Sequence, residues 1–209
     1  MRWSFDRTGF PMLELPQIGW SAQLWPVTKV QYERFLAEPN GPGDEWYESV
    51  LTISPRVSIA EANERNYESV FMAGVLPDEA KSLAGWLDTG CEIPKVADWR
   101  AVDQEFISTT IDAAELAALR EDPNLHPQAR KLLDWTVKQF QPQTWGQLAF
   151  LRDGILEWVR LEGGLYGGLG STRPKFLAVI VNPQRDEPVT PVRPEERRPY
   201  FGFRLLRPL

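Results

Sequence analysis

Cysteine and histidine, the residues that most often carry nucleophilic and metal chemistry, each occur once in this chain of 209 residues. Cys91 lies two residues before the dipeptide Ile93-Pro94, and we interpret it as a small, buried, apolar side chain. His126, the one histidine, lies in a proline-flanked loop, and a single histidine cannot form a histidine metal cluster. A serine triad could use only His126, and the sequence has no nucleophile-elbow pattern. A single cysteine also excludes an intrachain disulfide.

Glycines and carboxylates offer little further chemistry. The glycine-rich run from Gly163 to Ser171 lacks the lysine of a P-loop and does not lie between a strand and a helix, which argues against a phosphate cradle. The 29 acidic residues are too numerous for a catalytic pair to be singled out. The inventory of side chains therefore argues against catalysis. One enzymatic alternative stays open, a relocated metal site that would use Asp153, Glu157 and Arg204.

The composition predicts a soluble globular protein, with 43% hydrophobic and 25% charged residues. Nine tryptophans and eighteen prolines predict a loop-rich fold held by aromatic packing. No apolar run approaches the roughly 20 residues that span a bilayer, so we expect no membrane association. The first residues lack the apolar segment of a signal peptide, and together with the single cysteine this predicts a cytoplasmic protein.

The charge is unevenly distributed along the chain. The net charge of −6 argues against nucleic-acid binding by the overall field. Residues 170–209, however, carry eight basic and four acidic side chains, a formal charge of +4. This C-terminal segment could meet an acidic partner, and an ordinary solvated loop face is the alternative.

Two helices with a short elbow between them are the clearest local signal. Ala80, Leu83, Ala84 and Leu87 share one face of a helix expected over residues 77–87, which Gly90 should stop. Ile93-Pro94 should be extended, because a residue before proline avoids the helical region. A second helix is expected from Val96, with Val96, Trp99 and Val102 on one side. We expect Trp86 and Trp99 to be core residues.

The remaining elements follow from shorter patterns. Strands are expected over residues 10–16 and 18–25, and the Thr28/Gln31 capping box predicts a helix from Lys29. A short helix over 58–68 and a short strand over 70–75 should follow. Residues 106–147 predict a helical hairpin broken at Asp122-Pro123-Asn124. Later strands are expected within 148–159, over 176–181 and over 200–206.

Five stretches together resemble the formylglycine-generating-enzyme (sulfatase-modifying factor) family, and the match covers most of the chain. The family's pattern P-V-T-x-x-x-Y-x-x-F is matched by Pro26, Val27, Thr28, Tyr32 and Phe35, and its A-x-x-Y-C-x-W-L by Ala80, Leu83, Ala84, Trp86 and Leu87. The next pattern, R-L-P-T-E-A-E-W-E, is matched by Ile93, Pro94, Ala97, Asp98 and Trp99. The last two, L-x-D-M-x-G-N-V-W-E-W-V and G-F-R-L, are matched by Leu148, Ile155, Glu157, Trp158 and Val159 and by Gly202, Phe203, Arg204 and Leu205. The resemblance implies a single α+β domain with the irregular C-type-lectin-like fold, in which the 106–147 hairpin is an insertion that replaces the family's loops.

The resemblance also implies a function, which the residues modify. The enzymes of this family oxidise a substrate cysteine and need two cysteines before the final G-F-R, because a Cu(I) site requires soft thiolates. Residues 168–202 contain none. We therefore expect a pseudoenzyme that binds rather than reacts. A calcium ion held by Glu157 is implied by the family strand, although Asp153 and Gly154 replace its Gly and Asn, which removes one expected ligand.

On this scaffold the segment before the last strand forms the functional surface. The resemblance therefore places the binding residues at Tyr166, Arg173, Lys175, Arg185, Arg193, Arg197 and Tyr200. Related degenerate domains serve in bacterial signalling and defence assemblies, so a protein partner within such a system is expected. Arginine and tyrosine dominate interface energetics. The alternatives are that these tyrosines flank core strands and the arginines are solvated, or that the 106–147 hairpin is the docking element.

Overall fold

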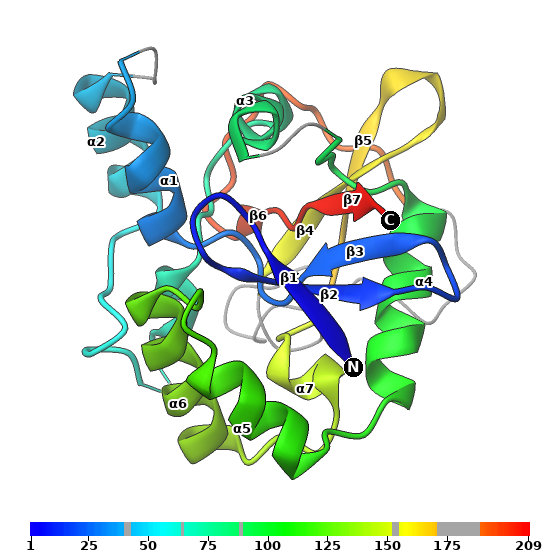
Figure 1. Ribbon diagram of the computed structural model, residues 1–209. Helices are drawn as coiled ribbons and strands as arrows, with labels where there is room; N and C mark the ends of the chain where they lie inside the picture. The colour runs from blue at the N-terminus through cyan, green and yellow to red at the C-terminus, as the bar shows by residue number, and fades with distance from the viewer. Residues whose placement is uncertain (40–42, 64, 88–89, 152–154, 171–188) are drawn as a thin grey trace.

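Two small β-sheets and a surrounding set of helices make up the α+β fold (Figure 1). The computed structural model describes residues 1–39, 43–63, 65–87, 90–151, 155–170 and 189–209. The first sheet is antiparallel, in the order β1-β2-β3-β7, and its strands span Arg2–Phe5, Pro11–Leu15, Trp20–Gln23 and Leu206–Pro208. The second sheet has the order β5-β4-β6, with strands Tyr166–Leu169, Leu156–Arg160 and Phe201–Gly202, of which β4 and β6 run parallel.

The helices surround the first sheet in Figure 1, with α1 and α2 on one side, α4 on the opposite side, α3 above and α5 to α7 below. Their bounds are Lys29–Leu36 for α1, Asp44–Ile53 for α2, Pro77–Leu87 for α3, Val96–Ser108 for α4, Ala113–Glu121 for α5, Pro127–Phe140 for α6 and Trp145–Leu148 for α7. Tyr67–Val70 and Glu162–Gly164 form 3-10 turns, η1 and η2. Within the described ranges, none of the helices combines the length and the apolar character needed to cross a lipid bilayer.

The capping box at Thr28 is confirmed. The Thr28 hydroxyl accepts from the Gln31 backbone N–H at 3.3 Å, and the Gln31 side chain accepts from the Thr28 N–H at 2.9 Å. Two backbone donors that an unfinished helix end would leave unpaired are thereby satisfied, and α1 begins at Lys29 as the pattern predicts.

The two helices around the Ile93-Pro94 elbow are also confirmed, with one correction. Helix α3 buries its predicted apolar face, and Gly90 beyond its end adopts φ +97°. Trp99 is 1% exposed, as expected of a core residue. Trp86 is only half-buried, because it lies at the rim of the core, where the Arg7 guanidinium lies 4.7 Å from its ring centroid.

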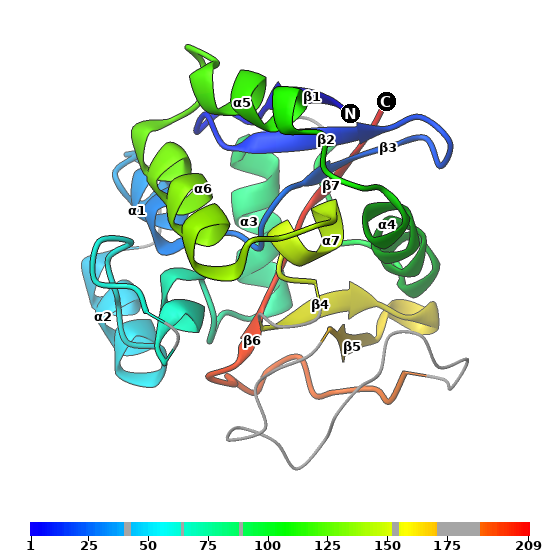
Figure 2. The same cartoon turned by 90° about the horizontal axis from the view of Figure 1, so that it is seen from below.

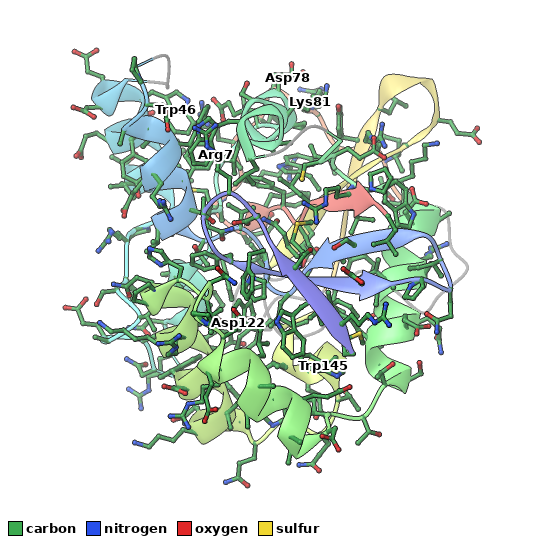
Figure 3. All side chains as sticks on the ribbon, viewed as in Figure 1. Arg7, Trp46, Asp78, Lys81, Asp122 and Trp145 are labelled. Carbon is green, nitrogen blue, oxygen red and sulfur yellow. The ribbon has the colours of Figure 1, made fainter. Side chains whose placement is uncertain are left out.

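The predicted hairpin forms as α5 and α6, and it is part of the core. The Asp122 segment separates the two helices, and the Trp3 indole donates to the Asp122 carboxylate at 3.1 Å (Figure 3 labels Asp122). Leu119, Leu132 and Leu133 are 0–1% exposed and belong to the same hydrophobic cluster as strand β2. The hairpin therefore forms one wall of the core, and it could not be deleted without uncovering that core.

Four local predictions differ from the structure. Where a helix was expected over 58–68, residues 59–61 and 65–66 form turns, and Tyr67 and Glu68 begin η1; residues 70–75 make a single bridge at Phe71 instead of a strand. In the 148–159 segment, β4 begins only at Leu156. The closing strand expected over 200–206 is divided into β6 and β7, because residues 203–205 cross from one sheet to the other (Figure 2). Helix α2 was not expected, and the strand expected over 176–181 lies outside the described residues.

Candidate functional site

A pocket of about 620 Å³ lies between the start of α4 and the hairpin formed by β4 and β5. Ligand sites typically measure roughly 300–1,000 Å³, so this pocket could hold a small molecule or a few side chains. Its basic lining residues are Lys95, Arg100 and Arg160, and its apolar ones include Val96, Leu161 and Leu165. Among the residues predicted for binding, Tyr166 lines this pocket.

Two backbone features bring the two sides of the pocket together. The chain reverses between β4 and β5 through Gly163 and Gly164, whose φ angles of +69° and +78° favour glycine. The elbow before α4 is fastened to β4, because the Arg160 N–H donates to the Pro94 carbonyl at 2.8 Å. Residues from distant parts of the sequence are thus held in one place by the main chain.

Arg160 is fixed in the pocket by two further contacts. Its Nε donates to the Ile93 carbonyl at 2.7 Å, and its Nη2 pairs with the Glu92 carboxylate at 2.7 Å. Both partners belong to the elbow segment, so the position of the guanidinium is coupled to the position of α4. A side chain held in this way loses little conformational entropy when a ligand binds.

Tyr166 lies deeper than a surface-binding residue would. It is 7% exposed, and its ring meets Trp158 edge-on at 6.4 Å between centroids. The Lys81 ammonium lies 5.2 Å from its ring centroid, and a hydrogen bond with Asp78 and another with Tyr166 raise the pKa of Lys81. Asp78 and Lys81 lie together on the exposed side of α3 in Figure 3. Tyr166 therefore forms an inner wall of the pocket.

Tyr200 belongs to a different pocket, of about 160 Å³, lined also by Ser54 and Ser69. The strand register explains the separation. Tyr166 pairs with Arg160 at one end of β4, while Phe201, next to Tyr200, pairs with Leu156 at the other end. Four strand residues correspond to about 13 Å. The fold thus assigns the two tyrosines to separate places.

The C-terminal arginines that the sequence predicts for binding do not line the pocket beside Tyr166 where the structure describes them. Arg197 makes a two-pronged ion pair with Glu79, with 2.7 Å between its Nη1 and one carboxylate oxygen, and it also donates to the Gly74 carbonyl at 3.0 Å. The Arg193 side chain is 77% exposed and pairs only loosely with Glu196 at 3.4 Å. Arg173, Lys175 and Arg185 lie outside the described residues.

Glu157 and Arg204 form a buried ion pair with side chains 1% and 0% exposed. One Glu157 oxygen accepts from Arg204 Nη2 at 2.9 Å, and the other accepts from the Trp99 indole at 2.8 Å. A calcium ion at Glu157 stays a prediction, and it would have to displace these donors. Asp153 lies outside the described residues, and the described part of the chain has no group of three or more acidic, histidine or cysteine side chains placed to hold a metal.

The structure adds a buried lysine that the sequence reasoning missed. Lys29 is 2% exposed, and its ammonium donates to the carbonyls of Ser69 and Phe71 at 2.7 and 2.8 Å and to the Ser54 hydroxyl at 3.0 Å. Burial lowers its pKa to about 7. The three acceptors match the three N–H groups of an ammonium, so Lys29 ties α1 to the segment after α2. No local pattern distinguishes such a lysine from an exposed one.

His126 and Cys91, the single histidine and the single cysteine, both have structural roles. His126 caps helix α6, because its Nδ1 accepts from the Gln128 N–H at 3.2 Å. Cys91 is half-buried against the hydrophobic cluster beneath α3. The sequence matches no model of a known protein family, and no curated protein matches it.

Proposed function

We propose that this chain is a non-catalytic binding module that recognises a protein partner through the pocket beside Tyr166. The observation that carries the proposal is the pocket itself, about 620 Å³ in volume, with Arg160 already fixed by Ile93 and Glu92. Preorganised polar groups beside apolar lining are typical of binding sites. Compared with the surface expected from the sequence, the proposed surface keeps Tyr166 and replaces the C-terminal arginines with Arg160 and its neighbours.

The structural roles of the reactive side chains support a binding function. Glu157 and Arg204, two of the three residues of the enzymatic alternative, are buried in a pair with each other, where a substrate could not reach them without disrupting that pair. The His126 imidazole serves as a helix cap. We therefore propose a pseudoenzyme relative to the thiol-oxidising family that the sequence resembles.

The positions of the matched residues support a C-type-lectin-like fold as a further part of this proposal. Thr28 caps α1, Trp99 bonds to Glu157, and Arg204 pairs with Glu157, so residues from four of the five stretches hold central positions. A place in a bacterial signalling or defence assembly is proposed from the resemblance alone.

A plugged pocket tests the binding surface. Ala97 is exposed and lines the pocket, so Ala97→Trp should obstruct the pocket without disturbing the core. Ala117 is exposed on α5 of the hairpin and offers a matched control, Ala117→Trp. A partner captured by the wild-type protein and identified by mass spectrometry should be lost with Ala97→Trp and retained with Ala117→Trp.

The same two variants also test the alternative that the partner docks on the α5–α6 hairpin. Docking through α5 and α6 predicts the opposite result, with the partner lost in Ala117→Trp and retained in Ala97→Trp. Retention by both variants would refute the proposed pocket and the α5 surface together. Thermal melting of both variants establishes that they are folded.

A further inference from the structure

We propose that the pocket beside Tyr166 binds an acidic peptide segment of the partner protein, with a carboxylate among the basic side chains and an apolar neighbour along Leu165. This inference rests on the proposed binding function and specifies its ligand. Its basis is the charge of the lining, the fixed position of Arg160 and the apolar rim.

The lining of the pocket has an excess of positive charge. Lys95, Arg100 and Arg160 face only one acidic lining residue, Glu162, which gives a formal charge of +2. Glu92, the partner of Arg160, and Asp98, which accepts from the Lys95 backbone N–H at 3.3 Å, lie beside the lining and bring the formal charge of the wider surroundings to zero. The chain as a whole carries −6, so the lining itself is opposite in sign to the whole chain. An acidic ligand is therefore directed to this pocket by the nearby cations and not by the overall field.

Arg160 and Lys95 contribute in different ways. The contacts of Arg160 to Ile93 and Glu92 use its Nε and Nη2, and its Nη1 makes no hydrogen bond to the described residues. A guanidinium held in this way can offer a directed donor to a carboxylate. Lys95 is exposed and has no ion pair within the described part of the chain, so its ammonium can follow the ligand.

The apolar part of the lining favours a peptide over a small anion. Leu165 is 50% exposed at the tip of the β4–β5 hairpin and adjoins the half-buried Val96 and Leu161 of the same pocket. A free phosphate or dicarboxylate would use the cations and leave this apolar surface in water. A peptide with an acidic residue next to an apolar one would use both, and burial of the apolar surface would add to its affinity.

A phage-displayed library of random peptides, selected on the immobilised full-length chain, tests the inference directly. Selected sequences should be enriched in Asp and Glu next to Leu, Ile, Val or Phe, relative to the unselected library and to a selection on Ala97→Trp. The best peptide, labelled with fluorescein, should lose at least about tenfold in affinity when its acidic residues become Gln, since each tenfold corresponds to only 1.4 kcal/mol.

Charge reversal in the protein supplies the matched control. Lys95→Glu should weaken the labelled peptide at least about fivefold, while Lys138→Glu, an equal change of charge on the exposed face of α6, should alter its affinity by less than about twofold. Equal effects of the two variants would attribute the binding to the overall charge and overturn the inference.

Other outcomes separate the inference from the function on which it rests. Selected peptides without acidic enrichment, no selected peptides at all, or displacement of the labelled peptide by millimolar inorganic phosphate would overturn the acidic-peptide inference. Loss of the captured partner in Ala97→Trp would still support the pocket as the binding site. Retention of the partner in Ala97→Trp would refute the proposed function itself.

Discussion

The Arg204 guanidinium and the Glu157 carboxylate form an ion pair at 2.9 Å, with essentially none of either side chain exposed to solvent. Arg204 also donates to the carbonyls of Gln23 and Ala149, both at 2.8 Å. Gln23 ends strand β3 of the first sheet, Glu157 belongs to β4 of the second, and Ala149 follows α7. One arginine therefore ties both sheets to the α7 segment.

Removal of this arginine should be strongly destabilising. Arg204→Met leaves the Glu157 carboxylate buried without its partner, and breaking a buried pair typically costs about 3–5 kcal/mol of unfolding free energy. Urea denaturation followed by tryptophan fluorescence measures the loss. Arg193→Met is the control, because that arginine belongs to an exposed pair worth about 1 kcal/mol or less. Similar losses in the two variants would contradict the central role of Arg204.

Lys29 should make stability rise with pH. Its folded-state pKa of about 7 lies below the ordinary value of 10.5, so between these two values the unfolded chain binds more protons than the folded chain. The unfolding free energy of the wild-type protein should therefore increase from pH 7 toward pH 9.5 relative to Lys29→Met, by on the order of a few kcal/mol. Denaturation curves across this range measure the difference.

A second measurement checks Lys29 without a substitution. Carbon-13 NMR of the lysine Cε signals in the wild-type protein should show one lysine that titrates near neutral pH. Titration of every lysine above pH 10 would contradict the desolvation of Lys29.

His126 should make stability fall in mildly acidic solution. Burial, helped by the nearby Arg34 charge, lowers its pKa below the ordinary value of 6.5, so the unfolded chain binds the proton more readily. Protonation also removes the lone pair that accepts from the Gln128 N–H. Unfolding free energy should therefore decrease as the pH falls through and below 6.5.

The variant His126→Asn isolates this effect, because asparagine can cap a helix but does not titrate. Its melting temperature should change less between pH 7 and pH 5 than that of the wild-type protein. An equal change in both proteins would show that His126 is not responsible.

Gly202 should not tolerate a side chain. A methyl group there would lie 2.5 Å from the Met72 carbonyl oxygen and would also collide with Ile155. Overpacking of this kind typically costs about 1–3 kcal/mol. Gly85→Ala is the matched control, because nothing lies within 4 Å of the added carbon and alanine favours the helix by about 1 kcal/mol. Thermal unfolding should show a lower midpoint for Gly202→Ala and a higher one for Gly85→Ala.

The sequence alone determined the elements whose signals are local. The capping box of Thr28 predicted the start of α1, the spacing of Ala80 and Leu83 predicted α3, and the break at Asp122 separated α5 from α6. Each depends on residues a few positions apart, where hydrogen bonding and periodicity act directly on the backbone.

Only the tertiary structure decided what these elements bring together. Lys95 and Arg160 are 65 positions apart, and the β-bridge between Lys95, just before α4, and Arg160 of β4 places them around one pocket. The Arg197 side chain, expected at a binding surface, instead pairs with Glu79, 118 positions away. Such contacts depend on packing between distant segments, and a charged residue has the same sequence signature whether it faces solvent, a ligand or another side chain.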